Sequence, residues 1–295
     1  MTRVSCAERA CRARAVLRHV AYPGLLVAVT ALGWLLLDAR APEPVVLFVP
    51  VVLLALALEG LERVVPWEPA WRAARGDVRT DVAHTIATVS LAPLVQGLVL
   101  SALPVREDGV LAAVSWLPLE VALLVVLGDL GPYLFHRASH EWSASLFRVH
   151  AVHHSPTRLY WLNAFRVHPI NLAANTALRL LPAALLGASP EALALAALLS
   201  AFGNAFSHAN VDLATGWLDR WLSTPRVHRL HHHVEARASQ SNYGGFVLVW
   251  DHLFRSARPP DASVRDGHVG VDGAPPEGWL AQLLHPVGVR CCAGA

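Results

Sequence analysis

The chain has 295 residues, of which 54% are hydrophobic and only 16% charged, and its mean hydropathy is +0.41. An average soluble domain has about 25% charged residues, so this composition excludes a disordered protein and disfavours an ordinary soluble enzyme. The net charge of +2 is uninformative, but there are 16 histidines, and ten of them fall between His136 and His232. The composition therefore indicates a membrane protein whose function resides in a histidine-rich region.

Six apolar segments have the length, or nearly the length, of a helix that crosses a bilayer, which requires about 20 residues. They cover residues 20–37, 45–58, 82–103, 110–127, 170–186 and 191–206. The second is short and contains Pro50, so a re-entrant segment is the alternative there. Only four residues, 187–190, separate the last two segments, and this tight connection predicts a helical hairpin.

Arginine is distributed unevenly over the predicted connections. The N-terminal tail, the stretches after the second and fourth segments and the C-terminal tail are rich in arginine, whereas the alternate connections hold only Arg40 and Arg106. By the positive-inside rule, both termini lie in the cytoplasm, and an even number of crossings agrees with this. We therefore expect an integral protein of a bacterial plasma membrane.

Three histidine motifs and one further histidine fall on the predicted cytoplasmic side. Residues three or four apart meet on one helical face, so each motif can present its imidazoles together. Neutral imidazole suits zinc, iron, copper or nickel, and one ion can rarely use more than four such ligands. Nine candidates therefore predict two metal ions, each with an open position. The candidates are His136 and His140; His150, His153 and His154; His228, His231 and His232; and His208.

Neither solvated loops nor lipid binding accounts for the histidine pattern. Solvated loop histidines would not repeat this spacing, and headgroup binding by Arg148, Arg158 and Arg166 would leave the spacing unexplained. No nucleic-acid partner is expected. The main alternative function is a membrane metal transporter or metal-binding protein that uses the same histidines. A transporter should place its ligands near the bilayer midplane on broken helices, whereas these clusters lie beyond the predicted helix ends, which favours an enzyme.

The motifs HRASH (136–140), HAVHH (150–154) and HRLHH (228–232), in this order around a hydrophobic hairpin, resemble those of the fatty acid hydroxylase/sterol desaturase superfamily of membrane-bound non-haem di-iron oxygenases. Asp129, Ser155, the RVHP stretch at 166–169, NYG at 242–244 and WDHLF at 250–254 add to the resemblance, which runs from about residue 79 to 254. The chain departs from the usual pattern at His252 and at Arg255-Ser256, away from the ligand motifs.

The resemblance implies that the nine histidines bind two iron ions and that O₂ is the co-substrate. It implies hydroxylation or desaturation of a C–H bond of a lipid, such as a sterol or a fatty acyl chain. A related reaction, such as aldehyde decarbonylation or ether-lipid cleavage, is a further alternative. The chain has no Cys₄ iron–sulfur pattern and no spare length for a haem domain, so we expect a separate reductase or electron carrier. The sequence does not specify an oligomeric state.

Three further residues are candidates for supporting the metal ligands, because ligating histidines usually donate their second N–H to a carboxylate or carbonyl. Asp129 precedes His136 by two helical turns, and Glu141 directly follows His140. For both, a surface charge or a helix cap is the alternative. His168 is a possible tenth ligand or a hydrogen-bonded residue at the head of the fifth segment, and Asn204 could hold a metal-bound water.

The expected fold class is all-α: an integral-membrane helical bundle with a cytoplasmic histidine-rich cap that holds two metal ions. We divide the chain into an N-terminal tail with two spans (1–78), a catalytic domain (79–255) and a loose C-terminal tail (256–295). The tail is expected to be loose because residues 256–278 are rich in proline, glycine and aspartate.

Overall fold

The computed structural model describes residues 6–103, 106 and 108–288. The regular structure of this part is helical, with three isolated β-bridges and no strand, which confirms the all-α prediction. Its α-helices are α1 (Cys6–Asp38), α2 (Glu43–Val64), α3 (Val78–Ala102), α4 (Leu117–Glu141), α5 (Ala144–His154), α6 (Pro169–Leu186), α7 (Pro190–Ser207), α8 (Pro225–His231), α9 (Ala236–Ser239), α10 (Val249–Leu253) and α11 (Trp279–Leu284).

Four of these helices, α1 to α4, are long and apolar enough to cross a membrane, so the chain is a membrane protein. Six spans were expected; α6 and α7, the fifth and sixth, have 18 residues each and are not among these four. The fourth also differs from its expected range of 110–127, because it starts at Leu117 and continues to Glu141. The first histidine motif therefore lies on the last turns of a membrane helix.

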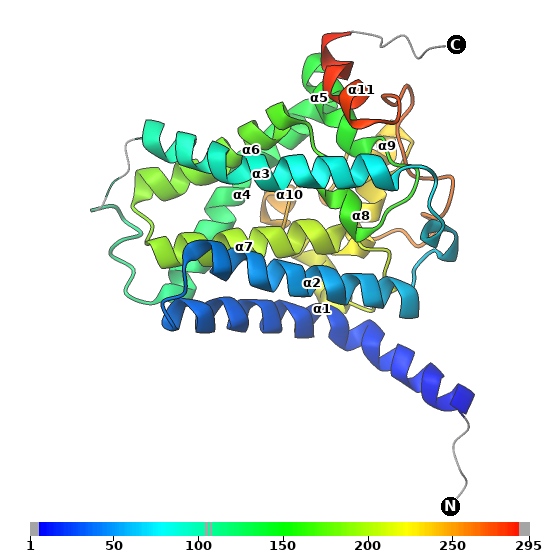
Figure 1. Cartoon of the computed structure of the whole chain (residues 1–295), viewed down its shortest axis with the longest axis horizontal. Coiled ribbons are helices and arrows are strands. Elements are labelled where there is room, and N and C mark those ends of the chain that lie inside the picture. Colours follow the sequence, from blue (N-terminus) through cyan, green and yellow to red (C-terminus); the bar gives the residue numbers. More distant parts are fainter. Residues whose placement is uncertain (1–5, 104–105, 107, 289–295) are drawn as a thin grey trace, which may run out of the picture.

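The long helices run side by side, as Figure 1 shows for α1, α2, α3, α6 and α7. The connections α1–α2 and α6–α7 lie together at one end of this bundle. The end of α4, together with α5 and α8, lies toward the other end. The histidine motifs are thus gathered at a single end of the bundle.

Helices α6 and α7 form the predicted hairpin, and local chemistry explains why the chain turns there. Gly187 ends α6 in the left-handed region, with φ of 70°, which glycine adopts without a steric cost. The Ser189 hydroxyl accepts from the backbone N–H of Ala192 and so caps α7. Glu120 of α4 accepts from both the backbone N–H and the hydroxyl of Ser189, which fixes the hairpin to α4.

Helices α4 and α6 approach closely because small residues line their contact. A Cβ added at Gly131 would lie 2.7 Å from the Cβ of Leu178 and 3.0 Å from its carbonyl oxygen. Real Cβ atoms essentially never come closer than 3.0 Å to such neighbours. Glycine at this position therefore brings α6, and the polar residues along it, against the helix that carries the first histidine motif.

The segment from 256 to 288, which was expected to be loose, is packed onto the rest of the chain. Val264 and Val269 are buried in a second apolar core together with Trp71. The indole N–H of Trp67 donates to the Val264 carbonyl, and Gln282 is buried against His84 of α3. The proline and glycine residues of this segment form turns without preventing its burial. Residues 289–295 lie outside the described part.

Candidate metal centre

All nine predicted histidines meet in two adjoining groups. Within each group, one ring nitrogen of every member lies within 4.8 Å of those of the others. Group A contains His136, His140, His150, His154 and His231; group B contains His153, His208, His228 and His232. The rings of His154 and His232, one from each group, stack with centroids 4.3 Å apart.

Each HxxHH motif is divided between the two groups. On α5, His150 and His154 belong to group A while His153 belongs to group B, and on α8 the single member of group A is His231. At about 100° per residue, position i+4 lies about 40° from position i, and position i+3 lies about 60° to the other side. One short helix can thus supply ligands to two neighbouring ions, which keeps the groups together.

Hydrogen bonds from Nδ1 fix the orientation of most of these rings. His136 donates to the Tyr243 carbonyl at 2.8 Å, and His231 to the Ser241 carbonyl at 2.8 Å. The remaining bonds run from His150 to the side-chain oxygen of Asn171, from His153 to the Arg166 carbonyl, and from His208 to the Asn204 carbonyl. An oxygen of this kind only accepts, so each ring carries its proton on Nδ1 and turns a bare Nε2 inward.

These bare nitrogens fit a bound cation. The Nε2 atoms of His153 and His208 lie 3.2 Å apart, although neither carries a proton to share. Two lone pairs at that distance repel each other unless a cation lies between them. Two nitrogens that ligate one ion at about 2.1 Å and an angle of about 100° are about 3.2 Å apart. The Nε2 atoms of His136 and His231 are likewise buried without a hydrogen-bond partner.

Burial keeps the imidazoles neutral, which is the form that binds metal. It lowers the pKa of His208 to about 4. Burial also holds the pKa of His228, His231 and His232 well below the ordinary value, and the neighbouring histidines add to the effect because each would repel a second positive charge. The rings therefore remain neutral, and able to bind metal, at physiological pH.

Asp129 and Glu141 do not bond to the histidines directly; both hold the segment 243–247. Asp129 accepts from the backbone N–H groups of Phe246 and Val247, and Glu141 accepts from the Tyr243 hydroxyl. Asp251 completes this set by accepting from the backbone N–H groups of Tyr243 and Gly244. The carboxylates thus position the Tyr243 carbonyl, to which His136 donates.

His168 lies outside both groups. Its Nδ1 accepts from the backbone N–H of Ile170 at the start of α6, and its Nε2 faces the Leu283 carbonyl at 3.0 Å. His168 therefore takes the hydrogen-bonded position at the head of α6, which was the alternative to ligation. Asn204 lines a cavity that reaches both groups, and it accepts from His208 through its backbone carbonyl.

Asn171 and Arg166 each hold one of these rings, and no local pattern in the sequence predicted this role. Asn171 acts through a side-chain oxygen, and an isolated asparagine gives no signal of this role. Arg166 acts through its carbonyl, while its buried guanidinium pairs with Asp81 of α3. Arg166 belongs to the RVHP stretch, but a carbonyl acceptor depends on the path of the backbone and not on the side chain.

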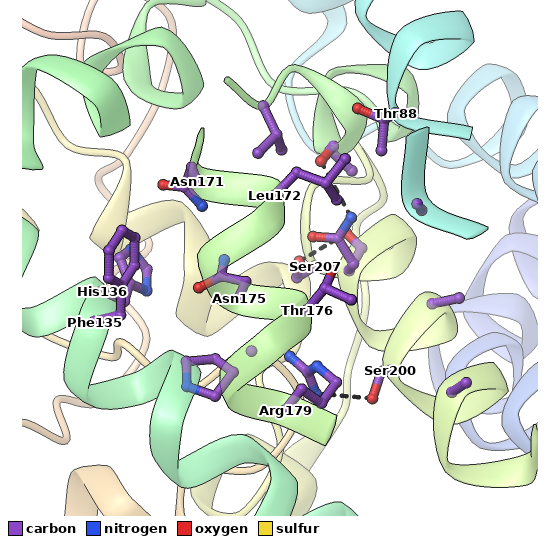
Figure 2. Close-up of a pocket in the computed structure, with 18 of the residues that line it drawn as sticks. Thr88, Phe135, His136, Asn171, Leu172, Asn175, Thr176, Arg179, Ser200 and Ser207 are labelled. Carbon is purple, nitrogen blue, oxygen red and sulfur yellow. Dashed lines mark hydrogen bonds between the residues drawn. The ribbon is translucent and has the colours of Figure 1, made fainter. Parts of the chain in front are cut away.

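The cavity has a volume of about 370 Å³ and lies between α3, α4, α6 and α7. Its wall includes His136 and His150 of group A and His153, His208 and His228 of group B. Most of the rest is apolar, but a row of polar side chains follows α6, as Figure 2 shows. The cavity can hold a largely apolar molecule with one part next to the imidazoles.

Comparisons with known proteins agree with this site. The family model for fatty acid hydroxylases matches residues 121–256, a range that contains all nine histidines. The chain is 35% identical to the ornithine lipid hydroxylase OlsE of Rhizobium tropici over 236 residues, which is 76% of this chain and 70% of that protein. The chain belongs to the fatty acid hydroxylase family, as its histidine motifs indicated.

More distant relatives share only part of the chain. An alkylglycerol monooxygenase of Danio rerio is 29% identical over 166 residues, 56% of this chain and 33% of that protein. The human alkylglycerol monooxygenase is 29% identical over 126 residues, 43% of this chain and 28% of that protein. No solved structure matches the chain significantly.

Proposed function

We propose that this protein is a membrane oxygenase that uses O₂ to hydroxylate a C–H bond of a lipid. The observation that carries the proposal is the pair of histidine groups facing one largely apolar cavity between α3, α4, α6 and α7. The family and the relatives, an ornithine lipid hydroxylase and alkylglycerol monooxygenases, favour hydroxylation over desaturation.

Groups A and B would each hold one iron ion through the inward Nε2 atoms. A pair of iron ions would supply the activation of O₂ that an unactivated C–H bond requires. The chain supplies the remaining conditions. Asn171 and the carbonyls at 166, 204, 241 and 243 hold five rings in the ligating tautomer, and the apolar wall excludes water.

The metal transporter is the weaker alternative. Transporters bind their cargo near the bilayer midplane, at a place that opens to each side in turn. Here the imidazoles come from helix ends that lie toward one end of the bundle, and their rings are bonded to backbone carbonyls. Such an arrangement suits a resident metal pair better than a transported ion.

We also propose that the enzyme lies in a bacterial plasma membrane. The placement of arginine supports an orientation with both termini and the histidine groups in the cytoplasm. A fluorescent protein fused to the C-terminus should fluoresce, and alkaline phosphatase inserted after Ala41 should be active outside the cytoplasm. The reverse pattern would contradict the orientation.

Within the chain, we propose residues 79–255 as the catalytic domain, with a separate reductase or electron carrier as partner.

Lipid analysis tests the proposed function. Cells that express the chain should contain a lipid heavier by one oxygen atom than cells without it, and growth under ¹⁸O₂ should transfer the heavy isotope into that product. A variant with His153→Ala should remain in the membrane and lose the product. An unchanged lipid profile with iron-loaded protein would contradict the proposal, and loss of two hydrogens instead would identify a desaturase.

A further inference from the structure

A second cavity lies beside the connection between α2 and α3 and has a volume of about 570 Å³. Its wall comes from the end of α2, the 3₁₀-helix η1 (Pro69–Arg72), the start of α3 and the segment 158–162. Figure 1 shows the α2–α3 connection at the end of the bundle opposite the turn between α6 and α7. The wall contains none of the nine histidines, so this cavity is separate from the metal centre.

Most of the charges around this cavity are neutralised by ion pairs. Nε of Arg158, which is buried, lies 2.6 Å from Asp77. Nη2 of Arg63 lies 2.6 Å from Glu59, and the indole N–H of Trp161 donates to the same carboxylate at 2.8 Å. Two charged residues of the wall, one acidic and one basic, are then left to meet charges on a bound molecule.

The acidic residue is Glu62, which lies in the last turn of α2 and is only 8% exposed. Its Oε1 accepts from the backbone N–H groups of Trp161 at 2.8 Å and Asn210 at 2.9 Å, and these bonds fix the carboxylate. Its Oε2 accepts no hydrogen bond from the described part of the chain, yet it remains accessible to a molecule in the cavity. Because a buried carboxylate without a donor is costly, this atom calls for a cationic N–H group.

The basic residue is Arg72, at the end of η1. It is exposed, and no carboxylate among the described residues pairs with it. A guanidinium in this state offers a fork of N–H donors that matches a phosphate group. Because Glu62 is buried and Arg72 is exposed, the cavity fits a zwitterion whose cation lies deeper than its anion.

An exposed apolar face leads away from the cavity along α3. Val78 lines the cavity, and Val82 and Ile86 follow at intervals of four residues on the same side of the helix. All three side chains are exposed, and at about 1.5 Å per residue they extend over about 12 Å. Since α3 is long and apolar enough to cross a membrane, this face suits the hydrocarbon chains of a lipid whose headgroup occupies the cavity.

We propose that this cavity binds the headgroup of phosphatidylethanolamine. The ammonium group donates to Oε2 of Glu62, and the phosphate accepts from Arg72. A choline headgroup cannot donate in this way, because its nitrogen carries three methyl groups, and a glycerol headgroup has no cation. The cavity thus selects a phospholipid with a primary amine, at a site that is distinct from the metal centre.

Native mass spectrometry of the full chain in detergent micelles tests this proposal by measuring how much lipid stays bound. The probes are the dioleoyl forms of phosphatidylethanolamine, phosphatidylcholine and phosphatidylglycerol, so that only the headgroup differs. The amine lipid should reach half-occupancy at about one tenth of the concentration that the other two need, because it alone adds a hydrogen bond to a charged group. Equal occupancy by the three lipids would overturn the proposal.

Two variants separate the contributions of the cation and the anion. Glu62→Gln keeps an oxygen for the N–H groups of Trp161 and Asn210 but carries no charge, so the preference for the amine lipid should disappear. Arg72→Gln should weaken the binding of all three lipids and keep the preference. Glu235→Gln removes an exposed carboxylate outside the cavity and is the matched control, which should change neither. A preference that survives in Glu62→Gln, or unchanged binding in Arg72→Gln, would also overturn the proposal.

A soluble competitor identifies the source of the headgroup. Free O-phosphoethanolamine carries the same ammonium and phosphate groups but has no chains to lie along α3. It should therefore displace the lipid only at concentrations at least about 100-fold higher. Displacement at an equal concentration would overturn the assignment of this site to a lipid.

Discussion

His232 and His233 are neighbours in the chain with different environments. His232 belongs to group B, whereas His233 accepts from the backbone N–H of Glu235 and lies outside both groups. We predict that His232→Ala lowers bound iron and reduces lipid oxidation at least about 100-fold, because second-sphere changes alone cost 10- to 100-fold. His233→Ala should retain both. Iron content and product formation are compared between the two variants. Equal effects would contradict the assignment of His232, and not His233, to group B.

The neutral state of the histidines predicts a pH dependence in the metal-free protein. Burial holds the pKa of His228, His231 and His232 well below the ordinary 6.5, so these rings take up protons mainly when the chain unfolds. Below about pH 6.5 the unfolded state binds more protons, and the free energy of unfolding falls by up to about 1.4 kcal/mol per pH unit for each such histidine. Melting temperatures should therefore decline from pH 7 to pH 5; constant or rising values would refute buried neutral rings.

The metal ligands could be predicted from the sequence, but the groups that orient their rings could not. The spacing of HRASH, HAVHH and HRLHH is a local property, so the nine histidines could be identified from the chain alone. The division of each HxxHH motif between two groups depends on how α5 and α8 are rotated against α4. The carbonyl acceptors depend on backbone path, and Asn171 on the register of α6, neither of which leaves a local signal.

Among the elements, the contact between α4 and α6 combines packing with charge. Asp129 of α4 pairs with Arg179 of α6 and also accepts two backbone N–H groups of the segment 243–247. Asp129→Asn should lower the free energy of unfolding by about 3 kcal/mol, because Arg179 is left without its counter-charge in a membrane bundle.

Adding Arg179→Met to Asp129→Asn should restore part of that loss, since it removes the unpaired cation. Asp108→Asn is the control, because the Arg106–Asp108 pair is exposed and should contribute little. Denaturant unfolding in detergent micelles compares these variants. A double variant that is less stable than Asp129→Asn would show that the unpaired charge of Arg179 does not cause the loss of stability.

Element boundaries were predictable where local signals mark them. The hairpin of α6 and α7 follows from Gly187 and the Ser189 cap within a short connection. Glu120 interrupts the expected fourth span, and its partner is Ser189, which is distant in sequence. The expected fourth span ended at residue 127, whereas the helix continues to Glu141, because a change from apolar to polar residues marks the exit from the membrane and not the end of a helix.

The segment 256–288 joins the membrane helices to the metal centre. Glu277 pairs with Arg166, whose carbonyl supports His153, and Val264 and Val269 complete a core around Trp71. These contacts connect residues about 100 to 200 positions apart, so composition alone suggested a loose tail.

We predict that a chain ending at Ser256 melts at a lower temperature and binds less iron than the full chain. Removing this segment exposes Trp71 and takes Glu277 away from Arg166. Thermal unfolding and iron analysis on membranes with equal protein content measure the effect. A truncated protein with unchanged stability and iron content would mean that the packing seen here contributes nothing.

If the two histidine groups hold two iron ions beside the cavity, each chain should bind two. The number of iron ions bound per chain is measured after anaerobic loading with Fe²⁺ and removal of free metal. The full chain should retain two iron ions. A variant with His140→Ala, in group A, and one with His228→Ala, in group B, should each retain fewer. One iron ion or none in the unaltered protein would contradict a two-iron centre.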